Sequence, residues 1–173
     1  MSARRSLIPL ALFGGAALAV LDCREPAPTA PDLQAPALQA SRAASQGDLL
    51  QCRPLPADSV TRTIGPEGGD IWVGPHRLHV PSDALRGSVR ITAVTPSDTV
   101  NRIRFRPEGL VFARPASLWM SYVNCQHQGA AGPKIAFTTD GLRILNYLPS
   151  KDYPGSRKVH GVLRHFSNYA VAW

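Results

Sequence analysis

Few residues of the sequence are arranged as a catalytic or metal-binding group requires. His76 and His79 stand three positions apart in a short alternating run, and residues three apart on a strand point to opposite faces, which prevents them from gripping one metal ion. Glu67 and Glu108 each stand beside glycine in a turn, where polar residues are common, and nothing pairs them as general acid and base. The sequence contains neither a G-x-S-x-G elbow nor a Walker-type phosphate loop. We therefore expect no enzymatic activity, no cofactor and no metal site.

The chain has three cysteines, Cys23, Cys52 and Cys125, an odd number that needs an explanation if the protein is exported. If Cys23 carries a lipid, Cys52 and Cys125 remain as a pair. A disulfide between them would close a loop of about 70 residues, which stabilises a fold by roughly 4 kcal/mol in the chain-entropy model. The alternative is two separate buried thiols. No C-x-x-C spacing is present, so the cysteines do not predict a zinc site.

Residues 1–22 have the pattern of an export signal. Arg4 and Arg5 precede an uncharged stretch at 7–21, which is shorter than the roughly 20 residues that a membrane-spanning helix needs. Val-Leu-Asp-Cys at 20–23 looks like the motif that precedes a lipid-modified cysteine, although Asp22 stands where a small uncharged residue is usual. We predict a lipid on Cys23, with cleavage after Ala19 to a soluble secreted form, or an uncleaved anchor, as alternatives.

Residues 23–48 are rich in proline, alanine, glutamine and serine and poor in residues that form a core. Such a segment does not offset the entropy lost on folding, and its prolines favour extended conformations. We predict a disordered tether that separates the anchor from a single domain at residues 49–173.

The formal net charge is +7, but beyond the leader the lysines and arginines are scattered singly, apart from Arg157 and Lys158. The sequence has no run of more than two basic residues and no nucleic-acid-binding motif, so we expect no nucleic-acid partner. The positive surface is either simply solvated or attracts anionic lipid or polysaccharide. The expected location is the cell envelope, with attachment to a membrane through Cys23 and an unidentified envelope protein or polysaccharide as partner.

Residues 49–173 predict an all-β domain. Sixteen prolines and fourteen glycines in the chain argue against long helices. Short alternating or apolar runs separated by turn residues predict strands at 60–64, 70–73, 77–80, 89–96, 103–106, 117–122, 134–138, 143–148, 159–163 and 169–173. Asp140 and Gly141, between two of these runs, are a strong hairpin signal. Many short strands at this spacing indicate one immunoglobulin-like antiparallel β-sandwich.

The alternation also predicts where side chains point. Residues 102–106 place three arginines on one face, which must be exposed or paired because an isolated buried charge is too costly. Residues 169–173 alternate Tyr, Val and Trp with alanines, and we expect the three larger side chains to face the core. Residues 81–85 are compatible with one helical turn capped by Ser82.

Three ordered motifs carry a family resemblance. The first is Ile-Gly-Pro-Glu-Gly-Gly at 64–69 with Val-Pro-Ser-Asp-Ala-Leu at 80–85, the second begins with Pro-Glu-Gly-Leu-Val-Phe at 107–112, and the third is His165, Phe166 and Ser167. Together they resemble the ZU-five domain, a β-sandwich module of ankyrins, netrin receptors and tight-junction scaffolds. Asp83 stands where that family usually has glycine, but aspartate tolerates left-handed backbone well enough to keep the turn.

The resemblance, over residues 61–173, implies a non-enzymatic interaction module, without naming its partner. Some members of the family cut themselves within the closing tripeptide. By resemblance, the Ser167 hydroxyl would attack the carbonyl of Phe166 while His165 takes the proton. The competing interpretation is structural, with Phe166 in the core and Ser167 capping the turn into the last strand. We expect this structural role and no cleavage.

Overall fold

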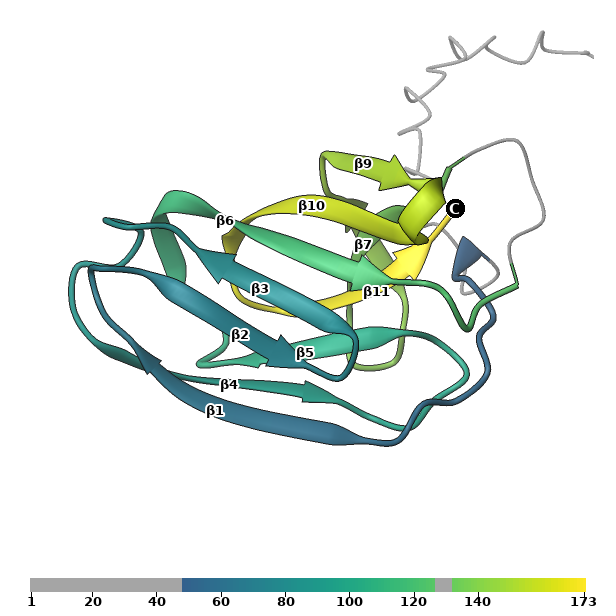
Figure 1. The fold of residues 1–173 in the computed structure, drawn as a ribbon, viewed down its shortest axis with the longest axis horizontal. Helices are drawn as coiled ribbons and strands as arrows, with labels where there is room; N and C mark the ends of the chain where they lie inside the picture. Colours follow the sequence, from purple (N-terminus) through teal and green to yellow (C-terminus); the bar gives the residue numbers. More distant parts are fainter. Residues whose placement is uncertain (1–47, 127–131) are drawn as a thin grey trace, which may run out of the picture. The chain divides into compact units, whose positions relative to one another are not determined.

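The computed structural model describes residues 48–126 and 132–173, which form two antiparallel sheets, one 3-10 turn (η2, Pro154–Ser156) and no α-helix (Figure 1). The six-stranded sheet contains, in spatial order, β1 (Asp58–Ile64), β4 (Val89–Thr95), β5 (Arg102–Arg106), β11 (Asn168–Ala172), β7 (Lys134–Thr138) and β8 (Ile144–Tyr147). The five-stranded sheet contains β2 (Gly69–Val73), β3 (His76–Val80), β6 (Val111–Ser121), β10 (Lys158–His165) and β9 (Ser150–Tyr153). The all-β sandwich that the sequence predicts is confirmed.

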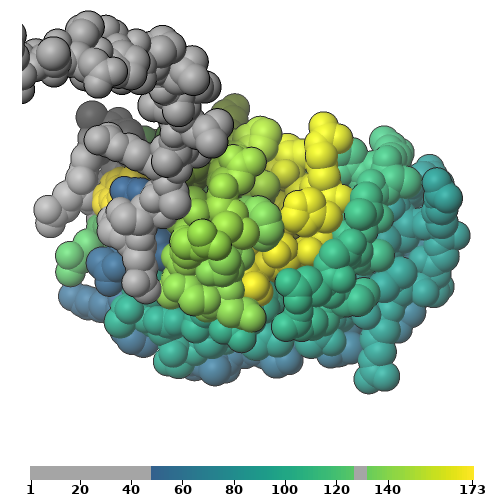
Figure 2. All heavy atoms as spheres, turned by 180° about the vertical axis from the view of Figure 1, so that it is seen from behind, coloured from purple at the N-terminus to yellow at the C-terminus, as the bar shows by residue number. Residues whose placement is uncertain are grey.

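The core lies between the two sheets and forms because each strand buries alternate side chains. In β3, Leu78 and Val80 are buried while Arg77 and His79 are partly exposed. The space-filling view from behind shows lime and yellow segments from the last third of the chain packed against teal segments from its middle (Figure 2). Strands distant in sequence therefore share one core, as a sandwich requires.

Strand β11 runs through the six-stranded sheet between β5 and β7, and all five of its residues are buried. Tyr169 and Val171 belong to the core between the sheets, as predicted, and Trp173 packs against that core. The two alanines of the strand face the other side. That side is also buried, under a second apolar cluster that includes Leu49.

Residues 48–50 lie beside the end of the chain. Leu49 forms an antiparallel bridge with Ala172, and the N–H of Trp173 donates to the carbonyl of Asp48 at 2.9 Å. The N–H of Leu50 donates to the carbonyl of Val171 at 3.0 Å. The described domain therefore begins with residues 48–50 paired to β11, although this segment is too short to count as a strand.

Cys52 and Cys125 form the predicted disulfide, with Cα atoms 3.7 Å apart across a sequence separation of 73 residues. Both residues are buried and lie opposite one another in an isolated antiparallel bridge. The alternative of two separate thiols is therefore wrong.

The arginine face of β5 is paired, as the cost of burying a charge demands. Arg102 forms a salt bridge with Asp98 at 2.8 Å, and the Arg104 Nε lies 3.8 Å from an oxygen of Asp140. Arg106 is paired with Glu108 in the adjoining turn.

Several details differ from the sequence-based expectation. Strand β6 begins at residue 111, six residues before the predicted start, and β9 was not predicted, because Ser-Lys-Asp-Tyr has no apolar alternation. The helical turn capped by Ser82 is wrong. Asp83 has a φ of 62°, and its N–H donates to the carbonyl of Pro66 at 2.7 Å instead of bonding within a helix. The left-handed backbone expected at this aspartate is confirmed.

The predicted signal segment, the tether up to residue 47 and the lipidation site Cys23 lie outside the described residues. In the part of the chain that is described, no helix has the length and apolar character needed to cross a membrane.

The two histidines of β3 lie on opposite faces, as predicted. His76 is 2% exposed, and its Nδ1 accepts a hydrogen bond from the Ser121 N–H at 3.1 Å. Burial lowers the pKa of His76 from 6.5 to about 4, so the buried ring is neutral at neutral pH.

This burial predicts an acid-sensitive fold. Between pH 6.5 and 4 the unfolded chain takes up a proton at His76 that the folded chain does not, so the free energy of unfolding falls as the pH falls through that window, by about 3 kcal/mol in total. Urea denaturation at several pH values between 4 and 7 measures this change in the free energy of unfolding. His76→Asn, whose side-chain oxygen can still accept the Ser121 N–H, should flatten this slope. The same slope in both proteins would show that His76 is not its source.

Candidate binding face

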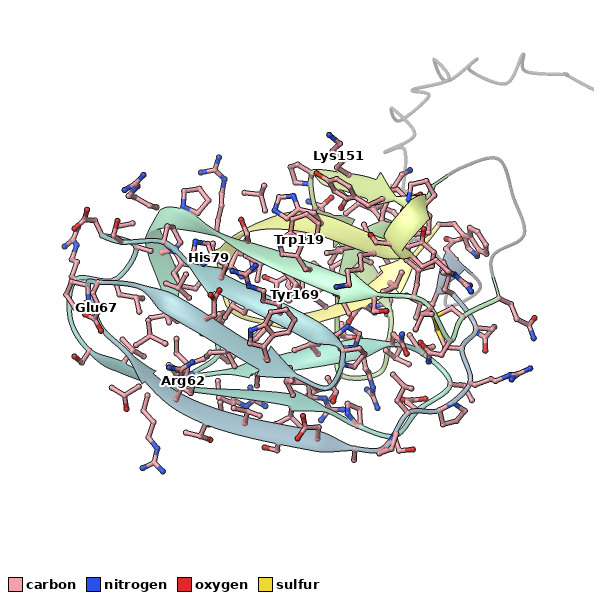
Figure 3. All side chains as sticks on the ribbon, in the orientation of Figure 1. Arg62, Glu67, His79, Trp119, Lys151 and Tyr169 are labelled. Atoms are coloured by element: carbon pink, nitrogen blue, oxygen red, sulfur yellow. A yellow bond between two sulfur atoms is a disulfide. The ribbon has the colours of Figure 1, made fainter. Side chains whose placement is uncertain are left out.

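The outer face of the five-stranded sheet carries a row of aromatic and cationic side chains. The pairing register aligns one residue from each strand: Trp72, Arg77, Trp119, His160 and Lys151. Tyr153 and Lys158, which pair with one another on β9 and β10, stand beside this row. These seven residues form the platform. Figure 3 labels Trp119 and Lys151 of the platform, together with the neighbouring His79.

Strand alternation explains why the two tryptophans face outward. Ile71 and Val73 fill the core, so Trp72 between them points away from it and is 53% exposed. Leu118 and Met120 are fully buried in the same way, which turns Trp119 to the outer face, where it is half-buried. The sequence carries this alternation, but no motif in it marks either tryptophan as functional. Their alignment depends on the register of β2, β3 and β6, which the sequence does not give.

The platform side chains contact one another. The Arg77 guanidinium lies over the ring of Trp72, 5.4 Å from its centroid. The ring of Trp119 packs against Tyr153 at 5.0 Å and His160 at 4.6 Å between centroids. Such contacts hold aromatic side chains in fixed orientations at little cost in entropy. Partial burial lowers the pKa of His160, which favours its neutral form on this face.

Asp70 fixes the cationic side of the platform. It accepts two hydrogen bonds from Arg77, at 2.9 and 3.0 Å, and lies 2.9 Å from Nδ1 of His79. The hydrogen bond from Arg77 is the main reason why the pKa of Asp70 is lowered, and the same bond raises the pKa of Arg77. The bidentate geometry leaves the guanidinium little freedom to turn. Arg77 is thus charged and positioned between the two tryptophans.

A shallow open pocket of about 240 Å³ lies on the platform. It is lined by Trp72, Pro75, Arg77, Trp119, Ser156 and Lys158. Two indole rings and two cationic side chains thus surround this depression.

The same face brings a serine beside the Asp70–His79 pair, because Ser117 on β6 is the cross-strand partner of His79. The order Asp, His, Ser is that of a hydrolytic triad. Within the described residues, however, the Ser117 hydroxyl makes no hydrogen bond to His79. Strand N–H groups lie in the plane of the sheet and do not point at its face, so they offer no oxyanion site there. This arrangement does not supply the parts of a catalytic site.

The closing tripeptide connects the two sheets. His165 ends β10 in the five-stranded sheet and β11 begins in the other, so Phe166 and Ser167 span the crossing. Phe166 is fully buried, and its ring stacks on Phe105 with 4.8 Å between centroids. The core position expected for Phe166 is therefore confirmed.

Backbone hydrogen bonds hold this crossing to the middle motif. The Phe166 N–H donates to the carbonyl of Leu110 at 2.8 Å, and the Gly109 N–H donates to the carbonyl of Phe166 at 3.0 Å. Nδ1 of His165 lies 3.4 Å from that same carbonyl oxygen. The Ser167 hydroxyl makes no hydrogen bond with another described residue, so the capping role expected for Ser167 is wrong. The second and third motifs thus serve together to fix the crossing.

We expect the peptide bond between Phe166 and Ser167 to stay intact. Self-cleavage needs a strained backbone, and the described non-glycine residues with positive φ, which are Asp83, Leu142 and Arg157, all lie elsewhere. Denaturing mass spectrometry of the purified protein after prolonged incubation shows whether this peptide bond has been cut. The wild-type protein and Ser167→Ala should both give uncut chains. A wild-type fragment that ends at Phe166, and is absent from the alanine variant, would overturn this expectation.

The first motif also has a structural role. Gly68 has a φ of 79°, and a side chain there would collide with the carbonyl oxygen of Val80. The close approach of Gly68 to Val80 and the hydrogen bond from the Asp83 N–H to the Pro66 carbonyl hold residues 64–69 and 80–85 of this motif against each other.

A scan against protein-family models finds no match to the chain, and a search of curated proteins finds no matching relative. The ZU-five resemblance therefore rests on the residues of the three motifs.

Proposed function

We propose that this chain is an exported, non-enzymatic protein of the cell envelope that binds an envelope polysaccharide through its platform. The Cys52–Cys125 disulfide supports export, since such bonds form and persist in oxidising compartments. The three motifs support a ZU-five-type interaction module. A lipid on Cys23 and the tether that follows it would keep the domain near a membrane.

The observation that carries the proposal is the alignment of Trp72, Arg77 and Trp119 on one outer sheet face. Exposed apolar side chains that lie together on a surface mark an interaction site more often than ones that stand alone. Indole rings have electron-rich faces, which attract the polarised C–H groups on the flat faces of sugar rings. An open face with two such rings suits an extended polymer better than a small molecule, which binds in a deep cavity.

Sedimentation with the insoluble envelope fraction of the producing cells tests this function, using the full chain with Cys23→Ser so that no lipid on Cys23 contributes to the association. Trp72→Ala should weaken the association about tenfold, as expected when a central aromatic anchor is removed. Leu145→Ala is the matched control, because Leu145 is 46% exposed and lies on β8 of the other sheet. Equal sedimentation of this chain with and without the Trp72 substitution would reject the platform as the binding surface.

Self-cleavage is the second candidate function. The observation in its favour is the Gly109 N–H, which is 3.0 Å from the Phe166 carbonyl oxygen and thus occupies the place of an oxyanion donor. The mass measurement described above decides between the candidates. The same measurement, on protein extracted from membranes, reports whether the mature chain starts at a lipid-modified Cys23.

A further inference from the structure

We infer that the polysaccharide is acidic, with sugar rings stacked on Trp72 and Trp119 and a carboxylate held by Lys158 at the pocket that both rings border. This inference rests on the proposed function and adds the charge of the ligand and the position of its anionic group.

The pocket supplies the shape for one such sugar. Trp72 and Trp119 border it, and the Lys158 side chain lies at the same depression of about 240 Å³. Two strand spacings separate the backbones of β2 and β6, so the two tryptophans stand on strands about 10 Å apart. A sugar chain running across the strands can therefore contact both rings in sequence. Its carboxylate would then meet Lys158 in the pocket that both rings border.

The charges of the platform favour an anion. Asp70 already neutralises Arg77 through the bidentate pair. Within residues 48–126 and 132–173, neither Lys151 nor Lys158 takes part in a salt bridge with an acidic side chain. Lys151 instead lies over the ring of Tyr153, 5.1 Å from its centroid. The platform thus carries unneutralised positive charge beside rings that select flat apolar surfaces.

Single-stranded nucleic acid is the other polymer that binds aromatic rings alternating with cations. Two features disfavour it. The disulfide indicates an oxidising compartment, where envelope glycans are found. In addition, proteins that bind single-stranded nucleic acid follow its phosphates with a continuous positively charged groove. Within the described residues, only Lys151 and Lys158 of the platform are cations without a hydrogen-bonded or salt-bridged acidic partner, which suits a ligand held at one anionic group better than a continuous phosphate backbone.

Calorimetric titration of the full chain with polygalacturonate tests the inference. The comparison ligand is the same polymer with its carboxyl groups reduced to alcohols, and a single-stranded oligonucleotide is the third ligand. We expect binding to polygalacturonate, and about tenfold weaker binding to the reduced polymer. Lys158→Gln should weaken binding of the acidic polymer severalfold and leave the reduced polymer unaffected. Arg86→Gln removes the same charge from an exposed loop away from the platform and should change neither.

The tryptophans provide the second arm of the test. Trp119→Phe keeps a ring and should retain most of the affinity, whereas Trp72→Ala should lose about tenfold, as for a central anchor. Thermal melting of each variant verifies that it folds. Equal affinity for the acidic and reduced polymers would overturn the inference that the ligand is acidic, while supporting the proposed binding of a polysaccharide. Tighter binding of the oligonucleotide, or no binding of polygalacturonate by protein that still sediments with the envelope, would overturn the acidic ligand.

Discussion

Deletion of residues 169–173 is expected to unfold the domain. Strand β11 pairs with β5 on one side and β7 on the other, and all five of its residues are buried. Burial of each large apolar side chain contributes about 1.5–3 kcal/mol, and the deletion removes Tyr169 and Val171 from the core. It also leaves β5 and β7 with unpaired backbone groups inside the sheet. The total approaches the 5–15 kcal/mol that holds a typical domain together.

Circular dichroism and thermal melting of the truncated chain measure this effect. The expected result is loss of the cooperative transition, with greatly increased sensitivity to protease. Deletion of Trp173 alone is the graded control, because this residue lies beyond β11 and packs against the core from its edge. It should lower the melting temperature and leave a cooperative transition. A five-residue truncation that melts like the complete chain would show that β11 is dispensable.

Reduction of the Cys52–Cys125 disulfide should lower the free energy of unfolding by roughly 4 kcal/mol, because the bond closes a long loop and restricts the unfolded chain. The Cα atoms of the two cysteines are 3.7 Å apart, and both side chains are buried. The N–H of Cys52 donates to the carbonyl of Thr99 at 2.7 Å, so the segment retains local contacts after reduction. We therefore expect a destabilised fold that is still native in topology.

Urea denaturation with and without reductant tests this expectation. The double variant Cys52→Ser, Cys125→Ser should match the reduced wild-type protein and show no further response to reductant. Cys23→Ser is the matched control, since it removes a cysteine outside the described domain and should leave the denaturation midpoint unchanged. An unchanged midpoint for reduced wild-type protein would contradict the stabilising role of the bond.

The sequence was most informative where one physical rule acts alone. Alternation of apolar residues located β2, β3 and β5 because one face of each strand must be buried. The cost of buried charge required the arginines of β5 to be either exposed or paired, and they are paired. The cysteine pairing followed from the expectation that Cys23 is lipid-modified. The left-handed backbone at Asp83 followed from the family resemblance, which places glycine there, together with the tolerance of aspartate for that conformation.

Features that depend on pairing between distant strands were not predictable. Strand β9 is held by its partner β10 and has little apolar character of its own. The alignment of Trp72 with Trp119 passes through β3 and exists only once three strands are in register. The sequence shows that each tryptophan lies between core residues, but not that the two share one surface. The binding face was missed for this reason.

The place where the domain begins determines how it would respond to mechanical force. A pull applied to the chain ahead of Asp48 first acts on its backbone contact with Trp173 and on the short pairing of Leu49 and Leu50 with β11. These few hydrogen bonds can open one after another. The load then reaches the covalent link at Cys52, which passes it to Cys125 beyond the end of β6. Peeling from this end would thus stop within five residues, and the five-stranded sheet that carries the platform would keep its register under tension.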